Sequence, residues 1–149
     1  MKLHDPVELI LRRKGSEVYS ISPDAMVYEA LEKLAEKNVG ALVVLDGTEM
    51  VGVLSERDYV RKVILKGFSS REIHVSRIMT SPVVTVDPKT TVDECMQLMT
   101  GHRTRHLPIV EKGRPAGLVS IGDLVNWIMT AQDQVIHQLE DYITGKYPA

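Results

Sequence analysis

The sequence predicts a mixed α/β (α+β) protein made of two copies of a β-α-β-β-α unit. Three observations support this fold class: a gapless internal repeat, a one-sided helical stripe in each copy, and paired apolar β runs in each copy. Residues 18–60 align with residues 83–125 at a constant offset of 65 residues, which indicates a duplicated structural unit. Identities recur at punctuating positions, namely Pro23 and Pro88, Gly52 and Gly117, Ser55 and Ser120, and Asp58 and Asp123.

The composition is that of an ordinary globular protein. The chain has 149 residues, of which 44% are hydrophobic and 26% charged. A net charge of −2 argues against a general nucleic-acid binder. The single cysteine, Cys95, excludes an intrachain disulfide and indicates a reducing compartment. With no signal-like or membrane-spanning run, we expect a soluble, cytoplasmic protein.

The elements before and between the repeats follow from turn and cap signals. A first helix is predicted with Asp5 as its N-cap, Pro6 in its first turn and an end by Gly15. The expected organisation is an N-terminal helix at 1–17, repeat 1 at 18–67, a linker at 68–82, repeat 2 at 83–130 and a C-terminal helical tail at 131–149.

Each repeat is expected to open with a strand, at residues 18–21 or 83–86, followed by a proline and a helix. The helices show buried stripes at helical spacing, with Val27, Ala30, Leu31 and Leu34 in repeat 1 and Val92, Cys95, Met96 and Met99 in repeat 2. Thr90, followed by Asp93, is the predicted cap of the later helix.

A β-hairpin and a second helix complete each repeat. Glycine-containing turns separate short apolar β runs, at 41–45 and 50–54 in repeat 1 and at 107–110 and 116–119 in repeat 2. The second helices are predicted to begin at Ser55 and Ser120.

Four segments together resemble a known family: VxTVxPxTTVxECMxLM, RHLPIV, GLVSIGD and the matching GVLSERD. They are similar to the tandem cystathionine-β-synthase (CBS) domain pair, or Bateman module, of the stand-alone prokaryotic type, and the resemblance covers about residues 6–130. It implies two repeats packed through their sheets about a pseudo-two-fold axis, with two clefts for adenine nucleotides. Such modules usually form homodimers.

Ser55 with Asp58, and Ser120 with Asp123, are the predicted centres of these clefts. A serine followed three residues later by an aspartate is close to a capping box, so the pair could simply start a helix. In the functional interpretation, Asp58 and Asp123 accept hydrogen bonds from the two ribose hydroxyls, as acidic residues do in dinucleotide sites. Ser55 and Ser120 would then also contact the nucleotide.

Basic side chains are the predicted phosphate ligands. Arg57 and Arg61 are expected to share a helix face, with Lys62 nearby. Arg103 and Arg105 are expected on one side of an extended segment and His106 on the other. Arginine suits bidentate phosphate contacts, although an ordinary solvated surface would also explain these residues.

By the family pattern, the adenine lies against backbone near the first strand of each repeat. The candidates are Ser20 and Ile21 in one cleft, Val84 and Thr85 in the other, Ala41 or Pro108 as a wall, and Met79 as a cover, although methionine in such a place is often core filler.

Catalytic and metal chemistry are not expected. Cys95 is predicted to be a buried thiol, and His102 with His106 has no third ligand nearby for zinc. The favoured function is therefore a non-enzymatic regulatory module that senses AMP, ATP or NAD, forms a homodimer and acts on an unidentified regulated protein. The alternatives are a ligand-independent homodimerisation scaffold and, less favoured, a binder of RNA or DNA.

Overall fold

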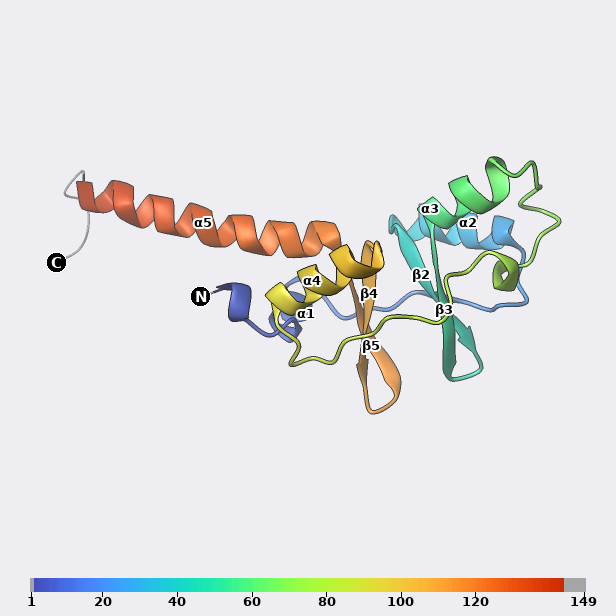
Figure 1. The fold of residues 1–149 in the computed structure, drawn as a ribbon, viewed down its shortest axis with the longest axis horizontal. Coiled ribbons are helices and arrows are strands. Elements are labelled where there is room, and N and C mark those ends of the chain that lie inside the picture. The colour runs from blue at the N-terminus through green and yellow to red at the C-terminus, as the bar shows by residue number, and fades with distance from the viewer. Residues whose placement is uncertain (1, 144–149) are drawn as a thin grey trace. The chain divides into compact units, whose positions relative to one another are not determined.

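The computed structural model describes residues 2–143, except for the side chains of residues 131–138 and 140–142. The chain forms helices, strands and short η elements (Figure 1). In order they are η1 (Lys2–His4), α1 (Glu8–Lys14), β1 (Ser20–Ile21), α2 (Val27–Lys37), β2 (Ala41–Asp46), β3 (Glu49–Ser55), α3 (Glu56–Tyr59), η2 (Val60–Ile64), η3 (Val75–Arg77), α4 (Val92–His102), β4 (His106–Glu111), β5 (Arg114–Ser120) and α5 (Ile121–Ile143).

These elements fall into two units. Unit 1 takes in the described residues before Ser16, Pro88–Leu107, and those from Val119 onward. Unit 2 takes in Ser16–Asp87 and Pro108–Leu118. The predicted β-α-β-β-α pattern of repeat 1 is therefore contained in unit 2, and both predicted hairpins are present as β2–β3 and β4–β5.

Unit 2 is built on a three-stranded sheet of order β1-β2-β3. Strand β1 pairs parallel to β2, with Ser20 opposite Val43, and β2 pairs antiparallel to β3. The turn between β2 and β3 places Gly47 at φ 65°, a conformation that glycine adopts without the steric cost of a Cβ atom. The apolar stripe of α2 packs on this sheet, and the shared core includes Val27, Ala30, Leu34, Leu42, Val44 and Leu54.

The linker after repeat 1 belongs to the same core. The Val27 N–H donates to the Ile73 carbonyl at 2.9 Å, and the Val75 N–H donates to the Ala25 carbonyl at 2.9 Å. Ile73, Val75 and Ile78 are buried. The linker therefore covers the start of α2 rather than crossing open solvent, because its apolar side chains complete a hydrophobic cluster.

In unit 1 the N-terminal segment covers the start of α4, as the linker covers the start of α2 in unit 2. The Val92 N–H donates to the Asp5 carbonyl at 2.9 Å, and the Val7 N–H donates to the Thr90 carbonyl at 2.7 Å. Helices α1 and α4 lie beside the first turns of α5 (Figure 1). Segments far apart in the sequence thus satisfy the free N–H groups at the start of the first helix in each repeat.

The prediction of a strand at residues 83–86 is wrong for every residue except Val86. Only Val86 pairs, in an isolated parallel bridge to Ile109. Its N–H donates to the Pro108 carbonyl at 3.0 Å, and the Val110 N–H donates to the Val86 carbonyl at 2.8 Å. This bridge matches the Ile21 and Val44 pair of repeat 1, so the pairing is repeated but the strand is not.

Two predicted helix caps are also wrong. Helix α1 follows Val7, with no side-chain cap, and Asp5 instead accepts a hydrogen bond from Trp127 Nε1 at 3.2 Å. Helix α4 is capped by Thr91 rather than Thr90, and the Thr91 hydroxyl accepts from the Glu94 N–H at 3.1 Å. The predicted end of α1 at Gly15 is confirmed: Gly15 has φ 100° and its N–H donates to the Leu11 carbonyl.

The last helix extends well past the second repeat. Helix α5 continues to Ile143, while residues 144–149 of the predicted tail lie outside the described residues. Among the residues that the structure describes, no helix has the length and apolar character needed to cross a membrane.

Candidate functional site

Both repeats place their serine and aspartate where a strand passes into a helix. Ser55 ends β3 before α3, and Ser120 ends β5 before α5. The Asp58 N–H donates to Ser55 Oγ at 3.2 Å and the Ser55 N–H donates to Asp58 Oδ2 at 3.0 Å. The corresponding distances for Asp123 and Ser120 are 3.1 Å and 2.8 Å. The capping-box interpretation is therefore correct for both pairs, and it fixes the position of each carboxylate.

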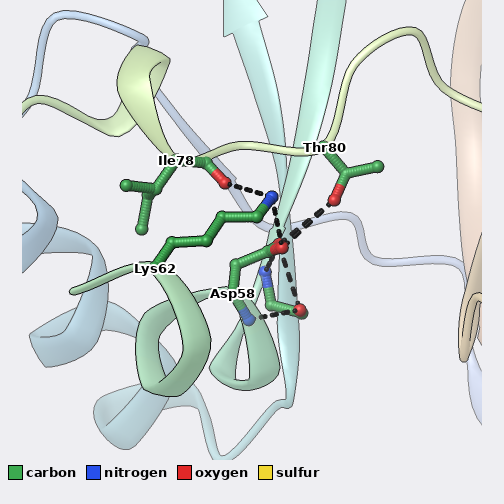
Figure 2. A network of polar contacts seen from close by, with 5 residues as sticks. Asp58, Lys62, Ile78 and Thr80 are labelled. Atoms are coloured by element: carbon green, nitrogen blue, oxygen red, sulfur yellow. Dashed lines mark hydrogen bonds and ion pairs between the residues drawn. The ribbon is translucent and has the colours of Figure 1, made fainter. Parts of the chain in front are cut away.

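Asp58 is the centre of a wider polar network (Figure 2). Its Oδ1 accepts a hydrogen bond from Thr80 Oγ1 at 3.1 Å and lies 3.0 Å from Lys62 Nζ. Lys62 Nζ also donates to the Ile78 carbonyl at 3.0 Å. Asp58 is only 8% exposed, and a buried carboxylate needs such partners. Both of its oxygens are engaged, since Ser55 holds Oδ2.

Asp123 has a different environment. The contacts described for its carboxylate fall on Oδ2, which accepts from the Ser120 N–H and lies 2.7 Å from Lys14 Nζ. Its side chain is 23% exposed, against 11% for Asp58. Burial raises the pKa of Asp123, but the hydrogen bonds and charge of Lys14 and the hydrogen bonds from Ser120 outweigh it, so the net pKa is lowered. Asp123 is therefore ionised at neutral pH.

Several predicted adenine-site residues lie near Asp58 within unit 2. Ala41 is the cross-strand partner of Ser55, and the Glu56 N–H donates to the Gly40 carbonyl at 3.1 Å. Met79 packs on Gly52, where an added Cβ would lie 2.7 Å from its Sδ. Met79 also precedes Thr80, which contacts Asp58. The sheet and the linker thus bring Ala41, Met79 and Asp58 together.

Ser20 and Ile21 lie on the edge strand of the same sheet. They pair with Val43 and Val44 of β2, close to Ala41. The Lys33 ammonium donates to the Ser20 carbonyl. Ser20 and Ile21 are therefore half-buried residues at the edge of the sheet, and the Ser20 carbonyl already accepts a hydrogen bond from Lys33.

The predicted phosphate ligands of repeat 1 follow Ser55 along the chain. Arg57 lies in α3 and is half-buried, whereas Arg61 is exposed and lies in the π-helical turn η2. Arg57 sits between the two residues of the capping box, so its backbone position is set by the cap.

The expectation that Arg103 and Arg105 lie along one side of a strand is wrong. Arg103 ends α4 in the left-handed conformation with φ 53°, and β4 begins only at His106. The Ile121 N–H donates to the Arg105 carbonyl at 2.9 Å, so Arg105 and His106 nevertheless lie beside Ser120 and the start of α5. The helix ends in a tight turn, which leaves no room for an extended stretch before β4.

The remaining predicted residues belong to unit 2. Val84 is half-buried and Thr85 is exposed, while Pro108 is buried and accepts from the Val86 N–H. The group within unit 1 therefore consists of Ser120, Asp123, Arg105 and His106, without these three.

Sequence reasoning missed three polar partners of the carboxylates. Lys62 could have been paired with Asp58, since a spacing of four residues on a helix is a recognisable signal. Lys14 is 109 residues from Asp123 and Thr80 is 22 residues from Asp58, and neither separation carries a local signal.

Cys95 is buried with 0% exposure, as predicted for a core thiol. Among the side chains that the structure describes, no group of three or more His, Cys, Asp or Glu residues is placed to hold a metal ion.

Comparison with known proteins agrees with the repeated geometry. The model of the CBS domain family matches residues 10–65 and 75–130. A mitochondrial CBS domain-containing protein of Arabidopsis thaliana, CBSX3, is 41% identical over 138 residues, or 89% of this chain and 66% of that protein. The CBS domain-containing protein YhcV of Bacillus subtilis is 31% identical over 73% of this chain and 77% of its own.

A solved structure of a protein with CBS domains from Burkholderia ambifaria shares the fold. It superposes with a TM-score of 0.82 and is 45% identical, covering 85% of this chain and 96% of its own. The two family matches together span most of the chain and coincide with the two repeats. The chain therefore belongs to the CBS domain family and carries a tandem pair of CBS domains.

Proposed function

We propose that this CBS pair is a regulatory module that binds an adenine nucleotide and changes conformation or partner affinity in response. CBS domains generally bind adenine nucleotides, and CBS pairs are regulatory modules of signal-transduction proteins. The observation that carries the proposal is the placement of Asp58 and Asp123. In each repeat a capping box holds an aspartate carboxylate at the strand-to-helix junction with a lysine ammonium against it.

A carboxylate in this position suits the sugar of a nucleotide. Its oxygens can accept hydrogen bonds from the two vicinal hydroxyls of a ribose. The negative charge would repel a phosphate group, so the phosphates point away from Asp123 and towards Arg105 and His106. In repeat 1 the corresponding phosphate contacts are Arg57 and Arg61.

The ligand class is AMP, ATP or NAD, and the module performs no catalysis. The adenine would lie against Ser20, Ile21, Ala41 and Met79 in repeat 1, while Val84, Thr85 and Pro108 remain adenine contacts predicted from the family pattern. Arg103 remains a proposed phosphate contact. A cytoplasmic location is part of the proposal, supported by the single, buried cysteine, Cys95.

Of the two carboxylates, Asp123 is the better candidate for binding. Its side chain is more exposed than that of Asp58, and its described contacts fall on one oxygen rather than two. A ligand at Asp58 would have to replace the Thr80 and Lys62 contacts of a nearly buried group. We therefore expect the Asp123 site to bind more tightly.

A thermal-shift panel of AMP, ATP, NAD and GMP, followed by calorimetric titration, tests the proposal. An adenine nucleotide at a hundredfold excess over its Kd should stabilise the protein by about 2.7 kcal/mol. Asp123→Asn should remove most of this shift. Asp93→Asn is a matched control, because Asp93 lies in the first turn of α4 and contacts Gln97. An unchanged response in the Asp123 variant would contradict the ribose role.

A second candidate function is a homodimerisation scaffold that needs no ligand. Exposed apolar residues occur at equivalent positions of the second helix of each repeat: Val60 and Ile64 in repeat 1, and Val125 and Met129 in repeat 2. Exposed apolar side chains four residues apart on a helix are typical of an interaction surface. We propose that a second copy of the chain covers them, in either function.

Sedimentation of Ile64→Glu and Met129→Glu tests the homodimer, with Leu65→Glu as a control at an exposed position without an apolar equivalent in repeat 2. We expect a monomer for the first two variants and a dimer for the control. A dimer that forms normally, in a protein that no nucleotide stabilises, would favour the scaffold over the sensor.

A further inference from the structure

An ion pair joins the end of the first helix to the start of the last one. Lys14 is the final residue of α1, and its Nζ lies 2.7 Å from Asp123 Oδ2 at the start of α5. The Lys14 side chain is 39% exposed and that of Asp123 is 23% exposed. Both residues belong to unit 1. Lys14 is therefore bound to the same carboxylate that is proposed to bind the ribose.

The lysine at Asp58 is held in another way. Lys62 lies one helical turn after Asp58, and its ammonium also donates to the Ile78 carbonyl. It is therefore a local partner within repeat 1. Lys14 comes from outside repeat 2, so breaking its contact with Asp123 affects a separate helix.

The residue after Lys14 marks the passage between the two units. Gly15 ends α1 with φ 100°, and an added Cβ there would meet nothing within 4 Å. Unit 2 begins at Ser16, and residues 12–17 are exposed. Lys14 is thus only two residues before the first residue of unit 2.

We propose that Lys14 is an internal competitor for Asp123, so that a nucleotide whose ribose hydroxyls donate to both carboxylate oxygens must displace the lysine ammonium from Oδ2. This inference rests on the proposed function and adds a residue that sets the affinity of one site. Oδ2 accepts from the Ser120 N–H and lies 2.7 Å from Lys14 Nζ. A carboxylate oxygen has two lone pairs, so a ribose hydroxyl that donates to Oδ2 needs the one that the ammonium holds. Displacement removes the ion pair between the C-terminal end of α1 and the start of α5.

The exchange is energetically accessible because the pair is partly exposed. Partly exposed ion pairs are weak, so removing the competitor should tighten Kd by roughly two- to fivefold. Salt should likewise lower the Kd of adenosine, which carries no phosphate, in the natural sequence, since ions screen the pair of Lys14 and Asp123.

Comparing the binding of adenosine and AMP separates two effects of Lys14: its competition with the ribose for Asp123 and its attraction of a phosphate. Adenosine carries no phosphate, so Lys14 can affect its binding only by competing for the carboxylate. For Lys14→Met, which keeps an unbranched apolar stem, we expect calorimetry to show tighter Asp123-dependent binding of adenosine by about two- to fivefold. The gain for AMP should be smaller, because a nearby positive charge that attracts phosphate is lost.

Arg12→Met is the matched control. Arg12 lies on the same helix, and its ion pair is with Glu8 at 3.9 Å rather than with Asp123. This variant should bind adenosine with the Kd of the natural sequence. Hydrogen exchange supplies a readout of the helix itself: adenosine should speed exchange of the Gly15 N–H, which donates to the Leu11 carbonyl at 2.8 Å. In Lys14→Met that exchange should already be fast without ligand.

The outcomes distinguish the inference from the proposed function. Adenosine binding that Asp123→Asn abolishes, but that Lys14→Met leaves unchanged or weakens, would overturn the competition while keeping the nucleotide site. If neither adenosine nor AMP binds to the natural sequence or to Lys14→Met, the proposed function fails and the inference fails with it.

Discussion

Asp58 and Asp123 occupy equivalent positions of the two repeats but differ in their surroundings. Each closes a capping box with a serine three residues earlier, at closely similar distances. Asp58 is nearly buried and is bound by Thr80 and Lys62, whereas Asp123 is more exposed and is paired with Lys14. The comparison shows that duplication preserved the local cap, while side chains outside the capping box decide how available each carboxylate is.

The largest expected effect is on stability, and it should be unequal. Asp58→Ala removes a cap and several hydrogen bonds to a charged group, and should lower the free energy of unfolding by about 2–3 kcal/mol. Asp123→Ala removes mainly the cap and a partly exposed ion pair, and should cost about 1 kcal/mol. Urea unfolding without ligand measures both. Equal losses would mean that the extra contacts of Asp58 contribute nothing.

A pair of glycines near the two carboxylates should respond in opposite directions. Gly52→Ala would place a Cβ 2.7 Å from Met79 Sδ and 3.1 Å from the Thr80 carbonyl oxygen, and overpacking of this kind costs about 1–3 kcal/mol.

Gly122→Ala, in the first turn of α5, would meet Ser120 Oγ at 3.6 Å, an ordinary contact. Alanine favours a helix over glycine, so we expect a gain of about 0.5–1 kcal/mol. Thermal unfolding of both variants measures the contrast. A tolerated Gly52→Ala would show that the linker is not packed tightly against β3.

The smallest expected effect is the pH dependence of what Asp123 contributes to the free energy of unfolding. The folded pKa of Asp123 is lowered from its ordinary value of 3.8, although burial alone would raise it. The carboxylate therefore contributes stability that is present above about pH 3.8 and is lost as the pH falls through the folded pKa.

In Lys14→Met the burial remains while the hydrogen bond and the charge of the lysine are gone, so the pKa of Asp123 should rise. Carboxyl-carbon NMR titration of the natural sequence and of the variant measures this shift. A pKa that stays the same would show that Ser120 alone lowers it.

Much of the fold could be predicted from local pattern. The two hairpins, the stripes of α2 and α4 and the burial of Cys95 follow from apolar periodicity, because side chains on one face must leave water together. The errors occur where a contact with a distant segment, or the lack of one, decides the local structure. Asp5 hydrogen-bonds to Trp127 instead of capping α1, and residues before Val86 do not form the expected strand.

The candidate site divides in the same way. The pattern of a serine and an aspartate three residues apart predicted both caps, and they are present. The left-handed turn at Arg103, which removes the expected alternation of Arg103 and Arg105, was not predicted, since arginine does not favour that conformation as glycine does.

By itself, the sequence determined the duplication, the order of elements in each repeat and the placement of each aspartate at a helix start. The duplication shows as a match at a constant offset of 65 residues, and the other two depend on residues within a few positions of one another. Only the tertiary structure decided that Thr80 contacts Asp58 while Lys14 pairs with Asp123. The reason is that Thr80 and Lys14 reach the carboxylates through chain reversals, and a contact between such distant residues leaves no periodic signal in the sequence.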